Sequence, residues 1–131
     1  MDVKCAFLNG DIIEDIYVQQ PKGFVSNPSL VCRLKKSLYG LKQAPMAWYA
    51  KIDGFLLSLI FVQCKYNTNV YLKLIHGYLM IIVLYVDDLL ITGSSKKDIS
   101  SLKDAMNHSL FMTDLGLLIQ FLGLEIAQSK H

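Results

Sequence analysis

The sequence is poor in cysteine, arginine and charge. It has three Cys, three Pro and a single Arg in 131 residues, and 18% of the residues are charged. The three Cys are widely spaced and form neither a metal-ligand motif nor a disulfide framework, so we expect buried, reduced thiols in an intracellular, cytoplasmic protein. The three isolated His show no zinc-binding pattern. A formal net charge of +2 is too small to predict nucleic-acid binding by itself.

Long hydrophobic runs are also absent, although 53% of the residues are hydrophobic. The longest uncharged apolar run, residues 77–86, is well short of the about 20 residues that a membrane-spanning helix needs, so we expect no membrane partner. The N-terminus has no basic region leading into an apolar run, so we expect no signal peptide and no secretion. A chain with so many apolar residues is not expected to be disordered. Its length predicts one domain or a piece of one.

The pattern of apolar residues predicts an α+β fold. Strands are expected at residues 16–18, 30–34, 70–75, 78–85, 89–92 and 117–127. The strand at 78–85 is almost wholly apolar, which predicts burial on both faces. One helix is expected to begin near Pro45, and a second after Ser95, which together with Asp98 resembles a capping box. This order of elements predicts helices packed on a mainly antiparallel sheet.

Two adjacent carboxylates, Asp87 and Asp88, interrupt the most apolar part of the chain. Burying them is costly unless they reach solvent at a turn or a cation neutralises them. If the flanking runs pair as a hairpin, Val86 and Asp87 lie at its tip and both carboxylates project near one point. Such oxygen ligands suit Mg²⁺, which takes one or two carboxylates together with substrate phosphates. An ordinary polar hairpin tip is the alternative, and the chemistry alone favours neither.

Residues 85–88 read Tyr-Val-Asp-Asp, which matches the Tyr-x-Asp-Asp signature of reverse transcriptases. Further blocks at 2–10, 31–45, 112–116 and 121–126 occur in the order and spacing of copia-type LTR-retrotransposon reverse transcriptases, which the whole chain resembles. The resemblance implies a right-hand polymerase fold. Its palm would have a ferredoxin-like antiparallel sheet with helices on one face. Part of the fingers would be joined to it in a single truncated domain over residues 1–131.

The resemblance also implies an activity, RNA-directed DNA polymerisation on an RNA or DNA template-primer with dNTPs. Asp2, Asp87 and Asp88 match the three catalytic aspartates, which with Val3 would hold two Mg²⁺ ions for nucleotidyl transfer onto a primer 3′-hydroxyl. Phe7 matches the bulky residue that excludes a 2′-hydroxyl. The full set of implied nucleotide-binding positions is Lys4, Ala6, Phe7, Tyr39 and Gly40.

A second set of positions would contact the primer and template. Its members are Tyr85, Val86, Arg33, Lys35, Lys36, Lys42, Ala44 and Pro45. From charge alone, the four basic residues of this set are better interpreted as a solvated surface. The resemblance favours phosphate contacts instead, since these come from Lys and Arg and do not depend on sequence.

The chain departs from the family pattern at two places. Met46 stands where the family usually has Arg, which weakens the expected grip on nucleic acid. The sequence also begins one residue before the first catalytic Asp, so we expect Asp2 to hang from a fraying N-terminus with little to hold it. The remaining fingers, thumb and RNase H segments would lie outside the chain. A truncated, non-catalytic retroelement remnant is therefore the alternative hypothesis to an active polymerase.

Overall fold

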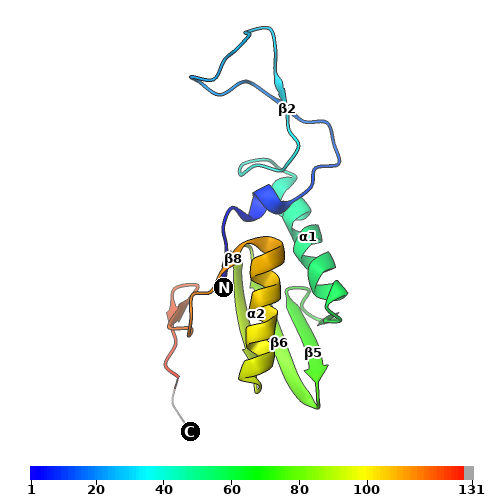
Figure 1. Cartoon of the computed structure of the whole chain (residues 1–131), viewed down its shortest axis with the longest axis vertical. Helices are drawn as coiled ribbons and strands as arrows, with labels where there is room; N and C mark the ends of the chain where they lie inside the picture. Colours follow the sequence, from blue (N-terminus) through cyan, green and yellow to red (C-terminus); the bar gives the residue numbers. More distant parts are fainter. Residues whose placement is uncertain (129–131) are drawn as a thin grey trace. The chain divides into compact units, whose positions relative to one another are not determined.

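The computed structural model describes residues 1–128, which form two compact units (Figure 1). The first unit combines Met1–Lys4 with the residues from Leu59 onward and is called the sheet unit. The second unit, Cys5–Ser58, is called the loop unit. The chain therefore leaves the sheet unit after four residues and returns to it 54 residues later, at the end of a helix.

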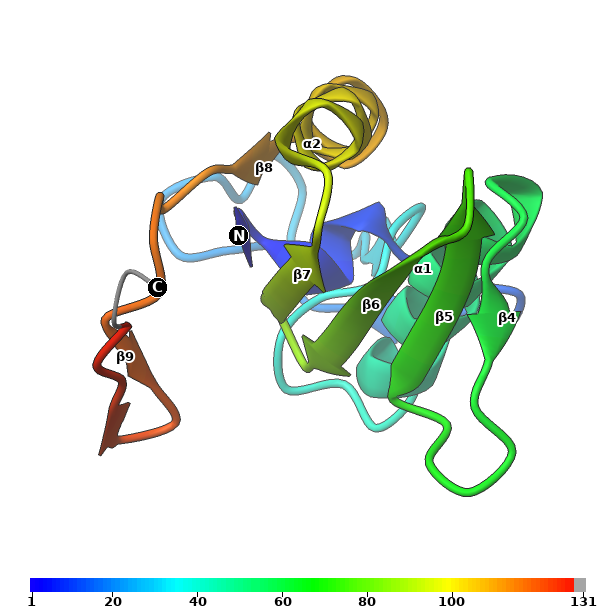
Figure 2. The same cartoon turned by 90° about the horizontal axis from the view of Figure 1, so that it is seen from below.

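A six-stranded antiparallel sheet forms the sheet unit. Its strands are β1 (Asp2–Val3), β4 (Val62–Gln63), β5 (Val70–Ile75), β6 (Tyr78–Tyr85), β7 (Asp88–Gly93) and β8 (Met112–Thr113). They are arranged in the order β4-β5-β6-β7-β1-β8, and Figure 2 shows β4 to β7 side by side. The strands expected at 70–75, 78–85 and 89–92 are confirmed, whereas β4 and β8 were not predicted. The sheet places β1 between β7 and β8, at the point where the carboxylates lie.

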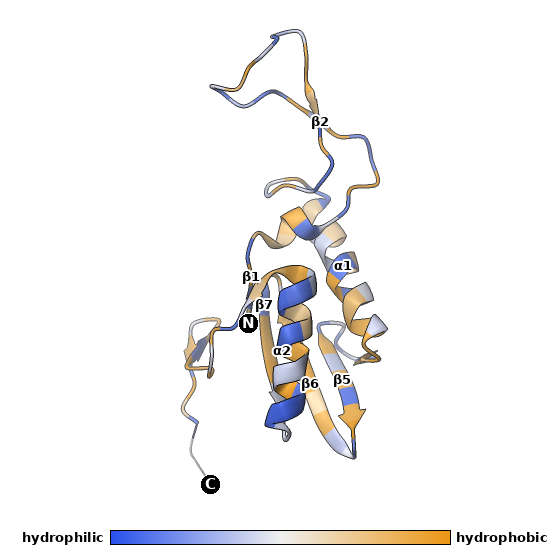
Figure 3. Ribbon diagram, in the orientation of Figure 1, coloured by the Kyte–Doolittle hydropathy of each residue, from blue (hydrophilic) through white to orange (hydrophobic). Residues whose placement is uncertain are grey.

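Burial alternates along β6. Met80, Ile82 and Leu84 are buried, while Ile81 and Val83 between them are only half-buried. The prediction that this strand is buried on both faces is therefore wrong. The reason is that a continuous apolar run is typical of parallel sheets covered on both sides, whereas an antiparallel sheet can bury one face alone. Figure 3 shows β6 as hydrophobic over much of its length.

Helix α2 (Lys96–Leu110) packs against β7 and β8. Its predicted start is confirmed, because the backbone N–H of Asp98 donates to the Ser95 hydroxyl at 3.2 Å and caps the first turn. Leu102, Met106 and Leu110 recur at helical spacing and are buried. The opposite face of α2 is hydrophilic (Figure 3).

The single strand predicted over residues 117–127 is wrong. The structure instead has a small hairpin of β9 (Gln120–Phe121) and β10 (Leu124–Glu125). Between them, Leu122 and Gly123 both adopt a positive φ, 51° and 81°. Two consecutive left-handed residues reverse the chain tightly, so the apolar run cannot continue as one strand.

The loop unit contains η1 (Ala6–Asn9), β2 (Tyr17–Val18), β3 (Cys32–Arg33) and α1 (Ala44–Ser58). The strands expected at 16–18 and 30–34 are confirmed as the short β2–β3 pair. The exposed segment between them is organised by Gln20, whose side-chain amide donates to the carbonyls of Asn27 and Leu30 at 2.7 Å each. The helix expected near Pro45 is confirmed as α1, with Trp48, Ile52 and Leu56 buried.

Gly10 ends η1 and lies directly against α1. Its φ of −73° is open to any residue, but a Cβ there would come within 2.9 Å of the Ala47 carbonyl carbon and the Trp48 nitrogen. Close backbone approach therefore requires this glycine.

The three cysteines are free, with Cys5 exposed and Cys32 and Cys64 half-buried, so the prediction that they are buried is wrong.

Candidate functional site

The aspartates proposed from the sequence meet on adjacent strands of the sheet unit. Asp2 on β1 is the register partner of Asp88, the first residue of β7. Asp87 lies one residue earlier, in the β6–β7 turn, and its carbonyl accepts a hydrogen bond from the Val3 N–H at 3.0 Å. The sheet thus brings Asp2 and Asp88 to facing positions, with Asp87 beside them.

The expectation that Asp2 hangs from a fraying N-terminus is wrong. On one side, β1 pairs with β8 through Asp2 and Val3, and on the other side it pairs with β7. The Met1 ammonium donates to the Leu89 carbonyl at 2.7 Å, and the Leu89 N–H donates to the Met1 carbonyl at 2.8 Å. Val3 is 2% exposed and anchors the strand in the core. The first residues of the chain are therefore tied down by both neighbouring strands.

The pKa of Asp88 reflects the negative charges that lie near it. Burial is the largest cause that raises the pKa of Asp88 above its ordinary value, followed by the charges of Asp87 and Asp2. The N-terminal ammonium opposes this effect. Burial in turn lowers the pKa of the Met1 ammonium, while nearby carboxylates raise it. The carboxylates of Asp87 and Asp2 thus lie close enough to Asp88 to disfavour its ionised form.

These residues have the donor chemistry of a hard divalent cation. Carboxylate oxygens are the usual protein ligands of Mg²⁺, which keeps several positions for water and substrate phosphates. Within residues 1–128, no group of three or more His, Cys, Asp or Glu is arranged to hold a metal ion.

The β6–β7 turn has the predicted tip. Tyr85 pairs with Asp88, so Val86 and Asp87 form the two-residue turn. Val86 has a φ of 53° and is half-exposed, as is Tyr85. A positive φ is a genuine outlier for a β-branched residue. Five other non-glycine residues between Cys5 and Leu122 share a positive φ, so this conformation does not by itself mark a site.

The aromatic residues predicted to bind nucleotide lie together in the loop unit. The ring centroids of Phe7 on η1 and Tyr39 are 5.5 Å apart with the planes tilted by 35°. Tyr39 is 89% exposed, and Gly40 follows it with a φ of 91° in a turn closed by the Leu41 N–H on the Leu38 carbonyl. Ala6 and Ala44 are buried, whereas Lys4 and Pro45 are exposed.

The four basic residues of the predicted phosphate-binding set are not equivalent. Arg33 forms an ion pair with Asp15 at 2.5 Å, and Lys36 forms one with Asp11. The Lys36 ammonium is also the main reason why the pKa of Asp11 lies below its ordinary value. Among residues 1–128, Lys35 and Lys42 form no ion pair and are exposed. Half of the predicted set is therefore matched by acidic partners within the same unit.

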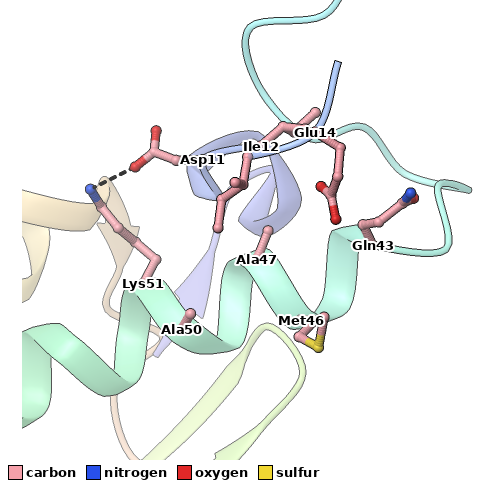
Figure 4. Close-up of a pocket in the computed structure, with 9 residues that line it drawn as sticks. Asp11, Ile12, Glu14, Gln43, Met46, Ala47, Ala50 and Lys51 are labelled. Carbon is pink, nitrogen blue, oxygen red and sulfur yellow. Dashed lines mark ion pairs between the residues drawn. The ribbon is translucent and has the colours of Figure 1, made fainter. Parts of the chain in front are cut away.

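A cleft of about 330 Å³ in the loop unit contains none of the predicted site residues. Its apolar floor comes from one side of α1 and from Ile12, with the Lys51–Asp11 ion pair at one end and Glu14 and Gln43 at the other (Figure 4). Met46, the residue that departs from the family pattern, lines it. The residues around it are Asp11, Ile12, Ile13, Glu14, Gln43, Met46, Ala47, Ala50 and Lys51. Sequence reasoning missed this cleft because its two walls are distant along the chain.

Comparison with known proteins identifies the class of protein. The family model described as reverse transcriptase (RNA-dependent DNA polymerase) matches residues 1–131, so the chain belongs to that family. More particularly, it is a reverse transcriptase region of the copia-type Pol polyproteins, and the resemblance seen in the sequence is confirmed. No solved structure matches the chain.

The relatives are transposon proteins of plants and yeast. The chain is 44% identical over 133 residues to the retrovirus-related Pol polyprotein from transposon TNT 1-94 of Nicotiana tabacum, covering 99% of this chain and 10% of that protein. It is 38% identical over 127 residues to the Pol polyprotein from transposon RE1 of Arabidopsis thaliana, with 95% and 9% covered. A putative transposon Ty5-1 protein of Saccharomyces cerevisiae is 40% identical over 133 residues, with 100% and 43% covered.

The chain thus spans about a tenth of the two plant polyproteins. Within residues 1–128, no helix is long and apolar enough to cross a membrane.

Proposed function

We propose that the chain forms the catalytic part of an RNA-directed DNA polymerase, with the sheet unit as palm and part of the loop unit as fingers. The observation that carries this proposal is the register pair Asp2–Asp88 with Asp87 at the adjoining turn. Asp2 lies on strand β1 and Asp88 on strand β7. Such rigid elements can hold catalytic groups within roughly 0.5 Å of the geometry that catalysis requires.

Asp2, Asp87 and Asp88 would hold the metal ions, assisted by the backbone of Val3. Two bound Mg²⁺ ions would supply charge neutralisation at the triphosphate and activation of the primer hydroxyl. The residues of the chain orient the reactants. Exposed Tyr85 and Val86 would lie near the primer terminus, and the Phe7 ring would stand against the sugar of the nucleotide. Their task is positioning, which dominates catalysis of phosphoryl transfer.

The loop unit would bind the nucleic-acid backbone. Lys35 and Lys42 are exposed cations that would contact phosphate groups directly. Arg33 and Lys36 would first have to exchange Asp15 and Asp11 for phosphate oxygens. Exposed ion pairs contribute little free energy, so this exchange is easily reversed. The polyprotein relatives are about ten times longer, and we propose that further polyprotein residues complete the grip on template and primer.

Metal binding by the 131-residue chain tests the site directly. We expect Mn²⁺, used as a paramagnetic probe, to bind and to be displaced by Mg²⁺. Asp88→Asn and Asp2→Asn should each weaken binding by tenfold or more, whereas Asp104→Asn on the exposed face of α2 should not change it. Equal binding by all variants would contradict the proposed site.

Primer extension tests the activity. We expect the 131 residues alone not to extend a DNA primer on an RNA template with Mg²⁺ and dNTPs, because they match only about a tenth of the polyprotein relatives. Template-dependent extension by the chain that Asp87→Asn abolishes would show that it is a complete catalyst. A chain that binds neither metal nor nucleotide would instead support the alternative of a non-catalytic remnant.

A further inference from the structure

A buried serine fastens the Tyr39 segment to η1. Ser37 is 0% exposed although its side chain is polar. Its hydroxyl donates to the Phe7 carbonyl at 2.7 Å, and its backbone N–H donates to the Gly10 carbonyl at 3.2 Å. Ser37 thus donates hydrogen bonds to two carbonyl groups of the η1 segment, those of Phe7 and Gly10.

These two hydrogen bonds join the segment that carries Tyr39 to the segment that carries Phe7. Ser37 is two residues before Tyr39, and its hydroxyl holds the backbone of Phe7 itself. Because Tyr39 is 89% exposed and its ring contacts Phe7, little else within the loop unit is available to orient it. A buried hydroxyl is unfavourable unless it is paired, and the Phe7 carbonyl pairs it. Loss of this bond would leave that carbonyl with the Gly10 N–H, at 3.1 Å, as its remaining donor.

We propose that Ser37 is a positioning residue for selection of the sugar, acting through Phe7 and Tyr39. The hydrogen bond from the Ser37 hydroxyl fixes the position of the Phe7 backbone, and the contact with the Tyr39 ring fixes the orientation of the Phe7 ring. Together they hold Phe7 where a 2′-hydroxyl on a nucleoside triphosphate would collide with it. This role rests on the proposed nucleotide site, and Ser37 itself does not touch the nucleotide.

The ring contact can be measured without any nucleotide. In the 131-residue chain with isotope-labelled Phe and Tyr, we expect a nuclear Overhauser effect between the Phe7 and Tyr39 rings. Ser37→Ala should abolish it. Ser58→Ala is the matched control, because the Ser58 hydroxyl also donates to a backbone carbonyl at 2.7 Å, that of Phe55, in the same unit. A ring contact that persists in Ser37→Ala would overturn the proposal.

Sugar selection is measured as the ratio of the dissociation constants for GTP and dGTP with Mg²⁺. We expect the chain to prefer dGTP, and Ser37→Ala to reduce the ratio by roughly fivefold, the size of effect that one hydrogen bond produces. Tyr39→Ala should reduce the ratio similarly, and because Tyr39 is exposed this variant tests the ring contact even if Ser37→Ala fails to fold. Ser58→Ala should retain the wild-type ratio.

The two measurements separate the possible failures. Loss of the ring contact with an unchanged GTP to dGTP ratio would overturn the role of Ser37 while leaving the nucleotide site intact. A wild-type chain that binds neither nucleotide would refute the nucleotide site and the selective role together. In that case, the ring-contact measurement would still decide whether Ser37 positions Phe7.

Discussion

The sheet unit and the loop unit are built by different means. In the sheet unit, β6 pairs with both β5 and β7 over six residues each, so the backbone itself fixes the geometry. The loop unit has a two-residue strand pair and one long helix, and it relies on single contacts such as those of Gln20, Ser37 and Gly10. The carboxylates lie in the first unit with Lys4 and Tyr85, whereas the other predicted basic residues and the Phe7–Tyr39 pair lie in the second. Metal ligands demand fixed geometry, whereas phosphate contacts tolerate a loop.

The largest effect is expected in the core of the sheet unit. Ile82 is 0% exposed at the middle of β6, between Tyr71 on β5 and Ile91 on β7. Ile82→Ala removes buried methyl groups and leaves a cavity, so we expect a loss of about 2–5 kcal/mol in the free energy of unfolding, measured by urea denaturation followed by circular dichroism. Leu74→Ala, at a 72% exposed position on β5, should change stability by less than about 0.5 kcal/mol.

Two glycines of the loop unit should respond in opposite directions to alanine. Gly10→Ala forces a Cβ against the backbone of α1, so we expect a loss of about 1–3 kcal/mol. Gly54→Ala lies inside α1 with no atom within 4 Å of the new Cβ and should gain up to about 1 kcal/mol through helix propensity. Fluorescence of Trp48, the single tryptophan, reports unfolding of this unit. A gain in both variants would show that η1 does not approach α1 as closely as described.

How well the sequence predicts the structure also depends on whether regular backbone pairing or single contacts hold a segment in place. Strand β6 was found because it is a nearly continuous apolar run of strand length, and helix α2 because apolar residues recur at helical spacing after a cap. The C-terminal hairpin was missed because Leu122, a residue without turn preference, adopts a positive φ. In the loop unit, the roles of Ser37 and Gly10 depend on contacts between distant segments, which no local pattern reveals.

The strained turn at the tip of β6–β7 should have a moderate effect. Val86 adopts a left-handed conformation that costs most residues about 1–2 kcal/mol, whereas Asn tolerates it. We therefore expect Val86→Asn to stabilise the sheet unit by about 1 kcal/mol in urea denaturation. Val83→Asn, in the extended part of β6, should destabilise it instead. Destabilisation by Val86→Asn would mean that side-chain contacts of Val86 outweigh its backbone strain.

The candidate site was found from sequence only in part. The Tyr-Val-Asp-Asp run marked Asp87 and Asp88 because charge inside an apolar strand pair is unusual, and the matching block at the N-terminus marked Asp2. The anchoring of Asp2 between β7 and β8 could not be anticipated, since β8 is two residues long and has no pattern of its own. The ion pairs of Arg33 and Lys36 were missed for a similar reason, because Asp15 and Asp11 precede them by 18 and 25 residues.

The smallest effects concern ion pairs, which also differ between the units. Lys103 on α2 donates to both carboxylate oxygens of Asp114, at 2.9 and 2.8 Å. This hydrogen bond is the main cause that lowers the pKa of Asp114, aided by the Gly116 N–H. Because the folded state favours the ionised carboxylate, its contribution to stability is present above the carboxyl pKa of the unfolded chain. It is lost as the pH falls through the lowered pKa of the folded state.

We therefore expect Asp114→Asn to be less stable than the wild type near neutral pH, by under about 1 kcal/mol since both side chains are partly exposed. The difference should shrink in acid and in 1 M salt, where the charges are screened. Asp15→Asn in the loop unit breaks the more exposed pair with Arg33, whose side chains are 65% and 58% exposed, and should have a smaller effect still. A larger loss for Asp15→Asn than for Asp114→Asn would reverse this order. It would show that the loop unit depends on its ion pairs more than the sheet unit does.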